Sequence, residues 1–282
     1  MVISGVTLGG GCMDLNRFFD TLWHAYISKT PQAEKIYQLI QAHNGQVVND
    51  HVAFRTFNRA PINIESIEPC FLAMGYRVFD EYDFPRKKLC AKAFINEDES
   101  QPKLFLSELV LEACSNTLQT IVDDMLANAD LPATVDETLF FQGTPWPTVS
   151  WHQYQTLLEE SEYAAWLSVM GFCANHFTIF VNRLAKNDSL DEVIELVQSL
   201  GLTMNEAGGL IKGNAMVGLQ QASTMADDMD YCFAEGDVHR IKTCYYEFAL
   251  RYPDELGQLY QGFVADSADK IFESTHHKLA SM

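Results

Sequence analysis

The stretch His51-Val52-Ala53-Phe54-Arg55-Thr56-Phe57 decides the fold of this chain, and its β-branched and aromatic residues predict a strand. Side chains alternate between the two faces of a strand, so His51 and Arg55 are expected on the same face. An imidazole beside a guanidinium suits a metal ligand next to an anion-binding group, because Arg grips a carboxylate through two hydrogen bonds. Taken alone, the stretch also fits a half-buried strand with a structural His and an Arg at its rim.

The pattern returns in the second half of the chain. His176-Phe177-Thr178-Ile179-Phe180 is another β-prone run that opens with a histidine. A helix-like stretch follows each run and stops at a glycine, Gly75 in the first half and Gly201 in the second, at nearly the same spacing from the histidine. We therefore predict an internal repeat in which each half contributes one histidine.

The composition argues against several classes of partner. The chain has 282 residues, 48% of them hydrophobic, which is ordinary for a folded core. A net charge of −19 argues against a nucleic-acid surface and an anionic membrane, because either would require a field of Lys and Arg. No apolar run reaches the roughly eighteen residues of a membrane span. An anionic substrate would have to be held by a few local cations.

The N-terminus and the cysteines favour the cytoplasm. Residues 1–12 are apolar and Gly-rich but have no Lys or Arg before their short hydrophobic run, so we expect a disordered or lightly packed leader and not a signal peptide. The seven cysteines are scattered and form no Cys-x-x-Cys pair, which favours reduced thiols over disulfides or a structural zinc site. We therefore expect a cytoplasmic protein.

We predict a single catalytic domain of the α+β class over residues 1–282. The first half reads as a strand, a helix and three further strands, and the second half repeats this order up to a final strand at Ile241–Leu250. The expected segments are N-terminal helices at 13–50, the first half at 51–111, an inserted helical segment at 112–172, the second half at 173–251, and a C-terminal helix and tail at 252–282.

Two carboxylates lie inside apolar strand-like runs. Glu108 belongs to Leu106-Ser107-Glu108-Leu109-Val110, and Glu247 occupies the corresponding place in Tyr245-Tyr246-Glu247-Phe248. Burying a carboxylate without a partner is costly, so each of them needs one. Arg251 shares the face of Glu247 if the strand continues that far.

Together, His51, His176 and Glu247 offer two imidazoles and one carboxylate from three strands. Such a facial triad holds Fe(II) and leaves positions open for a chelating substrate and O₂. No Cys is placed to join these residues, so iron or manganese is favoured over a closed zinc site. Glu108 would be either a fourth ligand or an acceptor that orients one imidazole, and we favour the second role.

Several motifs resemble the 2-oxoadipate dioxygenase/decarboxylase family, over a region from about Leu15 to Phe272. They are His51-Val-Ala-Phe-Arg55-Thr-Phe, the Ser107-Glu108-Leu run, Asn175-His176-Phe, Tyr245-Tyr246-Glu247-Phe and Asp266-Ser267-Ala-x-x-Ile-Phe. The resemblance implies a vicinal-oxygen-chelate fold, in which paired βαβββ modules surround one metal. This agrees with the repeat that the sequence predicts.

The resemblance also implies the site residues and the reaction. His51, His176 and Glu247 would bind Fe(II), and Arg55 would bind the substrate. The reaction would be O₂-dependent: a 2-oxo acid chelates the iron, loses CO₂ and is hydroxylated, so that 2-oxoadipate gives 2-hydroxyglutarate within lysine catabolism. The distal carboxylate of the substrate needs its own donor, for which Arg251, Ser267 or a backbone amide is a candidate.

Two other functions remain open at this point. A glyoxalase- or isomerase-like enzyme would use the metal as a Lewis acid without O₂, and Glu108 bound to the metal would favour it. A non-enzymatic module of the same fold would bind a small molecule without a metal at the repeat interface.

Overall fold

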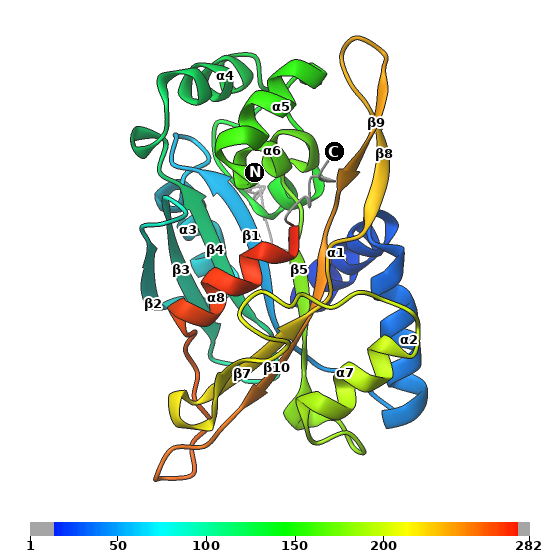
Figure 1. Ribbon diagram of the computed structural model, residues 1–282. Coiled ribbons are helices and arrows are strands. Elements are labelled where there is room, and N and C mark those ends of the chain that lie inside the picture. Colours follow the sequence, from blue (N-terminus) through cyan, green and yellow to red (C-terminus); the bar gives the residue numbers. More distant parts are fainter. Residues whose placement is uncertain (1–13, 276–282) are drawn as a thin grey trace, which may run out of the picture.

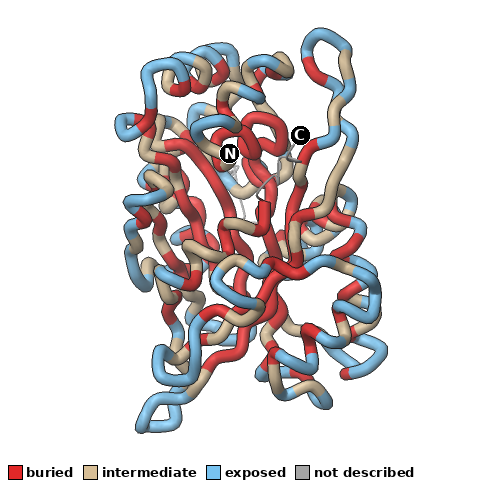
Figure 2. The backbone as a smooth tube through the Cα atoms, viewed as in Figure 1, coloured by how far each residue is buried: buried red, intermediate tan, exposed pale blue. Residues whose placement is uncertain are grey.

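The computed structural model describes residues 14–275, whose centre is one eight-stranded mixed sheet with the strand order β2-β3-β4-β1-β5-β10-β7-β6 (Figure 1). The predicted leader at residues 1–12 and the end of the predicted C-terminal tail lie outside the described residues. The strands in the middle of the sheet are buried along most of their length (Figure 2).

The sheet consists of two halves with the same βαβββ order, as the repeat predicts. The first half contains β1 (Asn49–Phe57), α3 (Ile64–Ala73), β2 (Tyr76–Phe84), β3 (Leu89–Asn96) and β4 (Lys103–Leu109). The second contains β5 (His176–Phe180), α7 (Leu190–Gln198), β6 (Lys212–Asn214), β7 (Leu219–Ser223) and β10 (Tyr245–Arg251). In each half the first and last strands pair in parallel, and β1 meets β5 in an antiparallel pair that joins the halves.

Glycines follow the helices of both halves at the predicted positions. Gly75 has φ +88° after α3, and Gly201 has φ +74° after α7. This left-handed conformation carries little penalty only for a residue without a Cβ, so each glycine turns the chain back toward the sheet.

The predicted single strand at Ile241–Leu250 is wrong. The chain forms two strands here, β9 (Val238–Lys242) and β10, and β9 pairs with β8 (Asp228–Cys232) in a separate two-stranded sheet. The break occurs at Thr243, whose N–H donates to Asp227 O and whose carbonyl accepts from the Trp166 indole. These contacts take the backbone groups that a continuous strand would use.

The N-terminal helices pack against one face of the sheet, and the helical insertion lies at one of its ends (Figure 1). The N-terminal pair is α1 (Leu15–Lys29) and α2 (Pro31–Asn44), and α1 buries Phe18, Leu22 and Tyr26 at four-residue steps. The insertion contains α4 (Asn116–Ala127), η2 (Glu137–Phe141), α5 (Trp151–Glu160) and α6 (Glu162–Met170). Ser161 separates the last two helices, and its hydroxyl accepts from Ala164 N to cap α6.

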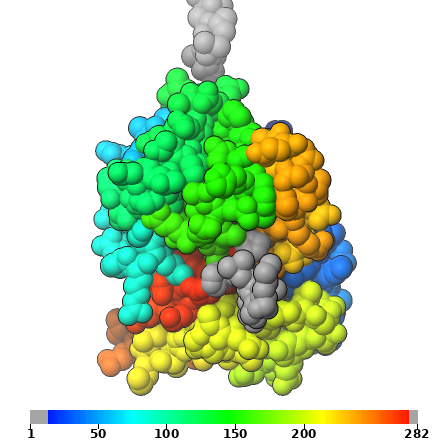
Figure 3. Space-filling view, turned by 45° about the horizontal axis from the view of Figure 1, so that its top comes forward, coloured from blue at the N-terminus to red at the C-terminus, as the bar shows by residue number. Residues whose placement is uncertain are grey.

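The last described elements lie against the face of the sheet between its halves. These are α8 (Ala265–Ile271) and the short helix η5 (Phe272–Thr275). Figure 3 shows α8 (red) at the surface, between the green helical insertion and the yellow part of the second half. Ser274 holds η5 in place, since its backbone carbonyl accepts from Ala226 N and its hydroxyl bonds to Ser223 and Asn205.

None of the helices between residues 14 and 275 has the length and apolar character that crossing a membrane requires. That the whole chain acts as one catalytic domain remains a prediction.

Candidate active site

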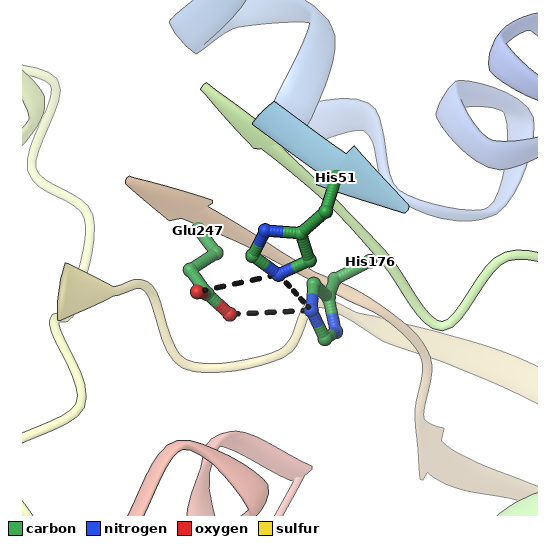
Figure 4. A group of neighbouring side chains, drawn as sticks. All are labelled: His51, His176 and Glu247. Atoms are coloured by element: carbon green, nitrogen blue, oxygen red, sulfur yellow. Dashed lines mark hydrogen bonds and ion pairs between the residues drawn. The ribbon is translucent and has the colours of Figure 1, made fainter. Parts of the chain in front are cut away.

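Three neighbouring strands bring His51, His176 and Glu247 together at the junction of the two halves (Figure 4). His51 lies on β1, His176 is the first residue of β5, and Glu247 lies on β10. Strand β5 runs between the other two, pairing Ala53 with His176 on one side and Thr178 with Glu247 on the other. All three side chains are buried. The residues predicted from sequence as a triad are therefore neighbours in the fold.

The donor atoms of the three side chains point at one another. His51 Nε2 lies 3.4 Å from His176 Nε2 and 3.6 Å from Glu247 Oε1, and His176 Nε2 lies 3.2 Å from Glu247 Oε2. Metal bonds of about 2.1 Å at right angles would separate their donor atoms by about 3 Å. The three donors therefore have the spacing of ligands on one side of a single ion.

Each imidazole is oriented by the residue that precedes it. His51 Nδ1 lies 2.8 Å from Asp50 Oδ1, and His176 Nδ1 lies 3.1 Å from Asn175 Oδ1. Because these oxygens can only accept, both Nδ1 atoms carry a proton in these bonds, and a neutral ring keeps its Nε2 lone pair for a ligand. A register shift between Asn49 and His51 lets Asp50 reach its neighbour's ring, although successive side chains normally point to opposite faces.

Burial shifts the pKa values of two triad members toward their neutral forms. It raises the pKa of Glu247 above its ordinary value, and the charge of His51 opposes this rise. It lowers the pKa of His176, which the charges of His51 and Arg55 lower further. Glu247 Oε1 accepts a 2.6 Å hydrogen bond from Gln221, while the buried Oε2 has no hydrogen-bond partner among the described residues. An unsatisfied buried carboxylate oxygen is what a metal ligand leaves when the ion is removed.

The prediction that Glu108 orients an imidazole or binds the metal is wrong. Its Oε2 accepts a 2.7 Å hydrogen bond from Ile64 N, at the start of α3, and its Oε1 accepts from Cys90 Sγ. Glu108 therefore caps a helix on the first half of the sheet, where the helix dipole favours a negative charge. The sequence correctly predicted that Glu108 has a hydrogen-bond partner, but this partner is the backbone amide of Ile64 and not a group of the triad.

Arg251 is not placed to bind a substrate, contrary to the sequence prediction. It is fully buried and donates from Nε to Asp50 Oδ2 at 2.6 Å and from Nη2 to Asp50 Oδ1 at 2.7 Å. Its Nη1 donates to the carbonyls of Tyr260 and Gly262. Burial would raise the pKa of Asp50, but the pair with Arg251 outweighs burial and lowers it. Arg251 thus holds the carboxylate that orients His51.

Ser267, also predicted as a substrate ligand, does not line the cavity at the triad or the cavity at Arg55. It lies on α8, and its hydroxyl is close to Gly213, where an added Cβ would meet it at 3.2 Å. The cavity at the triad has a volume of about 20 Å³, and α8 and η5 contribute Ala268, Ile271 and Phe272 to its lining. The side of α8 that faces the triad is therefore apolar.

Arg55 faces a second cavity, of about 250 Å³, and its guanidinium is only partly satisfied. Nη2 donates to Thr275 Oγ1 at 3.2 Å, whereas the buried Nε and Nη1 have no hydrogen-bond partner among residues 14–275. The guanidinium lies over the rings of Tyr163 and Trp166, at 4.9 and 4.8 Å from their centroids. Buried donors without acceptors on a desolvated cation are suited to an incoming anion.

Phe272 separates the two cavities. Of the described residues, it alone lines both the cavity at the triad and the cavity at Arg55. Its ring packs edge-on against Phe84, with centroids 5.4 Å apart, and lies 5.9 Å from the Arg55 guanidinium carbon. A molecule that bridges the triad and Arg55 must therefore pass this side chain.

Sequence reasoning missed the residues that support the triad. Asp50 and Asn175 each stand immediately before a predicted histidine, so the repeat of an acceptor followed by His was a usable signal. Gln221 lies far from the triad along the chain and carried no such signal, whereas Phe272 ends the Asp266-Ser267-Ala-x-x-Ile-Phe motif, which predicted no role for it.

The comparisons with known proteins identify the family. The sequence profile of a family described as 2-oxoadipate dioxygenase/decarboxylase matches residues 18–253. The chain belongs to this family. The chloroplastic 2-oxoadipate dioxygenase/decarboxylase of Arabidopsis thaliana is 32% identical over 91% of this chain and 76% of its own length. The resemblance predicted from the motifs is confirmed.

Two solved structures confirm the fold of this family member. The hydroxyglutarate synthase of Oryza sativa, crystallised with 2-oxoadipate, is 30% identical, covers 98% of each chain and has a TM-score of 0.86. A glyoxalase superfamily protein of Ralstonia eutropha is 21% identical over 93% of this chain and 92% of its own, with a TM-score of 0.75. The predicted α+β fold of vicinal-oxygen-chelate type is therefore confirmed.

Proposed function

We propose that this protein is an Fe(II)-dependent dioxygenase/decarboxylase that converts 2-oxoadipate and O₂ to 2-hydroxyglutarate and CO₂. The observation that carries the proposal is the buried convergence of His51, His176 and Glu247 in a member of this family. The similarity to the rice enzyme crystallised with 2-oxoadipate supports the choice of substrate.

His51, His176 and Glu247 would hold the iron through two Nε2 atoms and a carboxylate. Two neutral imidazoles and one carboxylate are the donor set of non-haem Fe(II) oxygenases. Iron bound there would supply redox chemistry that couples oxidation of the 2-oxo acid to O₂ reduction, together with open positions for this chelating substrate. The protein contributes the orientation of both rings, through Asp50 and Asn175.

Arg55 would hold a carboxylate of the substrate. Its free Nε and Nη1 can each donate a hydrogen bond to an incoming anion, and the rings of Tyr163 and Trp166 keep water away from the ion pair. Tyr163 is itself fixed, because its hydroxyl donates to Ser107 O and accepts from Thr56 N. A substrate held at both ends would lose little freedom on the way to reaction.

Reconstitution of the apoprotein with Fe(II) tests the function directly. We expect O₂ uptake and CO₂ release in equal amounts with 2-oxoadipate, and neither with glutarate, which lacks the keto group. His176→Ala should abolish both signals, whereas His152→Ala, at an exposed position on α5, should leave them unchanged.

The same assay separates the two other functions. Turnover of a 2-oxo acid without O₂ would contradict the proposal and favour an isomerase- or glyoxalase-like reaction. Binding of 2-oxoadipate without turnover, in wild type and His176→Ala alike, would favour a binding module.

A second variant tests Arg55. Arg55→Met should weaken substrate binding by about 2–5 kcal/mol, because it leaves the carboxylate unpaired in a desolvated site. Arg17→Met, at an exposed position on α1, provides the matched control. Equal substrate affinity of the two variants would show that Arg55 does not bind the substrate.

The pathway and the location remain predictions. Consumption of 2-oxoadipate supports a place in lysine catabolism, and accumulation of this acid in cells that lack the protein would test it. The Arabidopsis relative is named chloroplastic and gives no support to the expected cytoplasmic location, which localisation of a tagged chain would test.

A further inference from the structure

Two consecutive tyrosines on β10 face opposite sides of the sheet. Tyr246 packs against α1, with its ring centroid 5.7 Å from that of Trp23 and 6.2 Å from that of Tyr26. Tyr245 lines the cavity at the triad, and its ring stacks on His176 with centroids 4.6 Å apart and planes inclined by 25°. Both side chains are fully buried.

Neither tyrosine hydroxyl has a hydrogen-bond partner among residues 14–275. Leaving a buried hydroxyl unsatisfied costs about 1–3 kcal/mol, so a phenylalanine would be the more stable choice at either position if only packing mattered. For Tyr246 the surroundings are aromatic rings of the core. For Tyr245 the surroundings are the site at which we propose that a substrate binds.

Arg55 presents unsatisfied donors close to the same place. Its Nε and Nη1 are buried and without acceptors in the described part of the chain. Tyr245 lines the cavity at the triad and Arg55 lines the second cavity, and Phe272 borders both of them. Three buried donor groups on these two residues are therefore without a hydrogen-bond partner among the described residues.

We propose that the Tyr245 hydroxyl donates a hydrogen bond to an anionic oxygen of the bound 2-oxo acid, beside Arg55. This inference rests on the proposed function, because it takes the ligand to be the substrate that the triad and Arg55 bind. A carboxylate accepts several hydrogen bonds, so it can take one from the Tyr245 hydroxyl beside one from Arg55. Tyr245 is then a substrate-binding residue, and its ring keeps His176 in place.

The test compares Tyr245→Phe with Tyr246→Phe. Each substitution removes one buried, unsatisfied hydroxyl from the same strand and keeps the ring. Calorimetric titration of the Fe(II)-loaded proteins with 2-oxoadipate, without O₂, should show about 10-fold weaker binding for Tyr245→Phe, as expected for a hydrogen bond to a charged acceptor. Tyr246→Phe should bind within twofold of wild type.

Thermal unfolding of the metal-free proteins excludes a structural explanation. Both variants should unfold at the wild-type temperature or above it, because no hydrogen bond of the free protein is lost. Equal affinity of Tyr245→Phe and wild type would overturn the inference. Equal weakening by the two substitutions would also overturn it.

Titration with glutarate, which lacks the keto group, tests the role of Tyr245 separately from the proposed substrate. If wild-type protein binds glutarate but not 2-oxoadipate, the proposed substrate is wrong. Weaker glutarate binding by Tyr245→Phe than by wild type would still support Tyr245 as a donor to a bound carboxylate. Equal glutarate binding by the two proteins would contradict this role.

Discussion

Asp50 and Arg251 are 201 positions apart in the sequence and form a bidentate ion pair that is fully buried behind the triad. The same Asp50 carboxylate accepts from the imidazole of His51, so one chain of contacts leads from Arg251 to a triad nitrogen. Phe263 closes this group, with its ring 5.5 Å from the Arg251 guanidinium carbon and edge-on to His51 at 4.8 Å.

Arg251→Lys should weaken metal binding. An ammonium cannot reproduce the two parallel hydrogen bonds to Asp50, so the carboxylate is free to shift and His51 loses its fixed orientation. We expect metal affinity to fall about 10- to 100-fold, as for other groups that support a ligand. Co(II) titration of the apoprotein measures this without any turnover.

The control is Arg59→Lys, in a pair with Glu112 whose carboxylate is 63% exposed. Exposed pairs contribute at most about 1 kcal/mol to stability, and this one is unconnected to the triad. If Arg251→Lys binds metal as tightly as wild type, Asp50 orients His51 without help from the Arg251 guanidinium.

Glu108→Gln and Glu247→Gln should have opposite effects. Glu108→Gln removes a charge at the N-terminus of α3 and should lower the free energy of unfolding by about 0.3–1 kcal/mol, with metal affinity unchanged. Glu247→Gln should abolish metal binding. Since burial raises the Glu247 pKa above its ordinary value of 4.5, ionisation costs stability as the pH rises through that raised pKa. The metal-free Glu247→Gln protein should therefore be at least as stable as wild type at neutral pH.

Chemical denaturation and Co(II) titration of both variants check these expectations. Loss of metal affinity in Glu108→Gln would show that Glu108 does contribute to metal binding.

The sequence predicted those parts of the fold and the site that repeat. His51 and His176 stand at the same point of two similar halves, and Glu247 is a carboxylate inside an apolar strand, so local patterns were sufficient to select them. Glu108 matched the second of these patterns equally well, because periodicity shows that a carboxylate is buried and does not show which donor it meets.

The remaining features depend on contacts between distant segments. The register shift that lets Asp50 reach His51, and the pairing of Asp50 with Arg251, arise only when β1, β5 and β10 assemble. The insertion likewise reads as a helical cover in sequence, yet its α6 supplies Tyr163 and Trp166 to Arg55. No local periodicity records such contacts, because each depends on tertiary packing.

Phe272→Ala should join the two cavities. Removing the ring opens a direct path from the Arg55 cavity to the triad, so dipicolinate, an anionic chelator, should strip Co(II) from the loaded protein about 10-fold faster than from wild type. Phe84→Ala is the matched control, because Phe84 contacts Phe272 but lines neither cavity. Both substitutions should cost about 3 kcal/mol of stability. Equal stripping rates in the two variants would mean that Phe272 is not the barrier.

Lys212 should make the stability of the protein depend on pH in the alkaline range. Its buried ammonium donates to the carbonyls of Asn205 and Leu210, and burial lowers its pKa from 10.5 to about 8, with Glu247 opposing the shift. Between these two values the folded chain holds fewer protons than the unfolded chain, so the contribution of Lys212 to the free energy of unfolding rises with pH across this window. Below pH 8 or so, Lys212 is charged in both the folded and the unfolded chain, and its desolvation cost is fully present.

Lys212→Met carries no titratable group, while the other lysines and tyrosines titrate alike in both proteins. Urea unfolding at pH 7, 8.5 and 10 should therefore show wild type gaining stability relative to Lys212→Met as the pH rises, and a constant difference would contradict the lowered pKa.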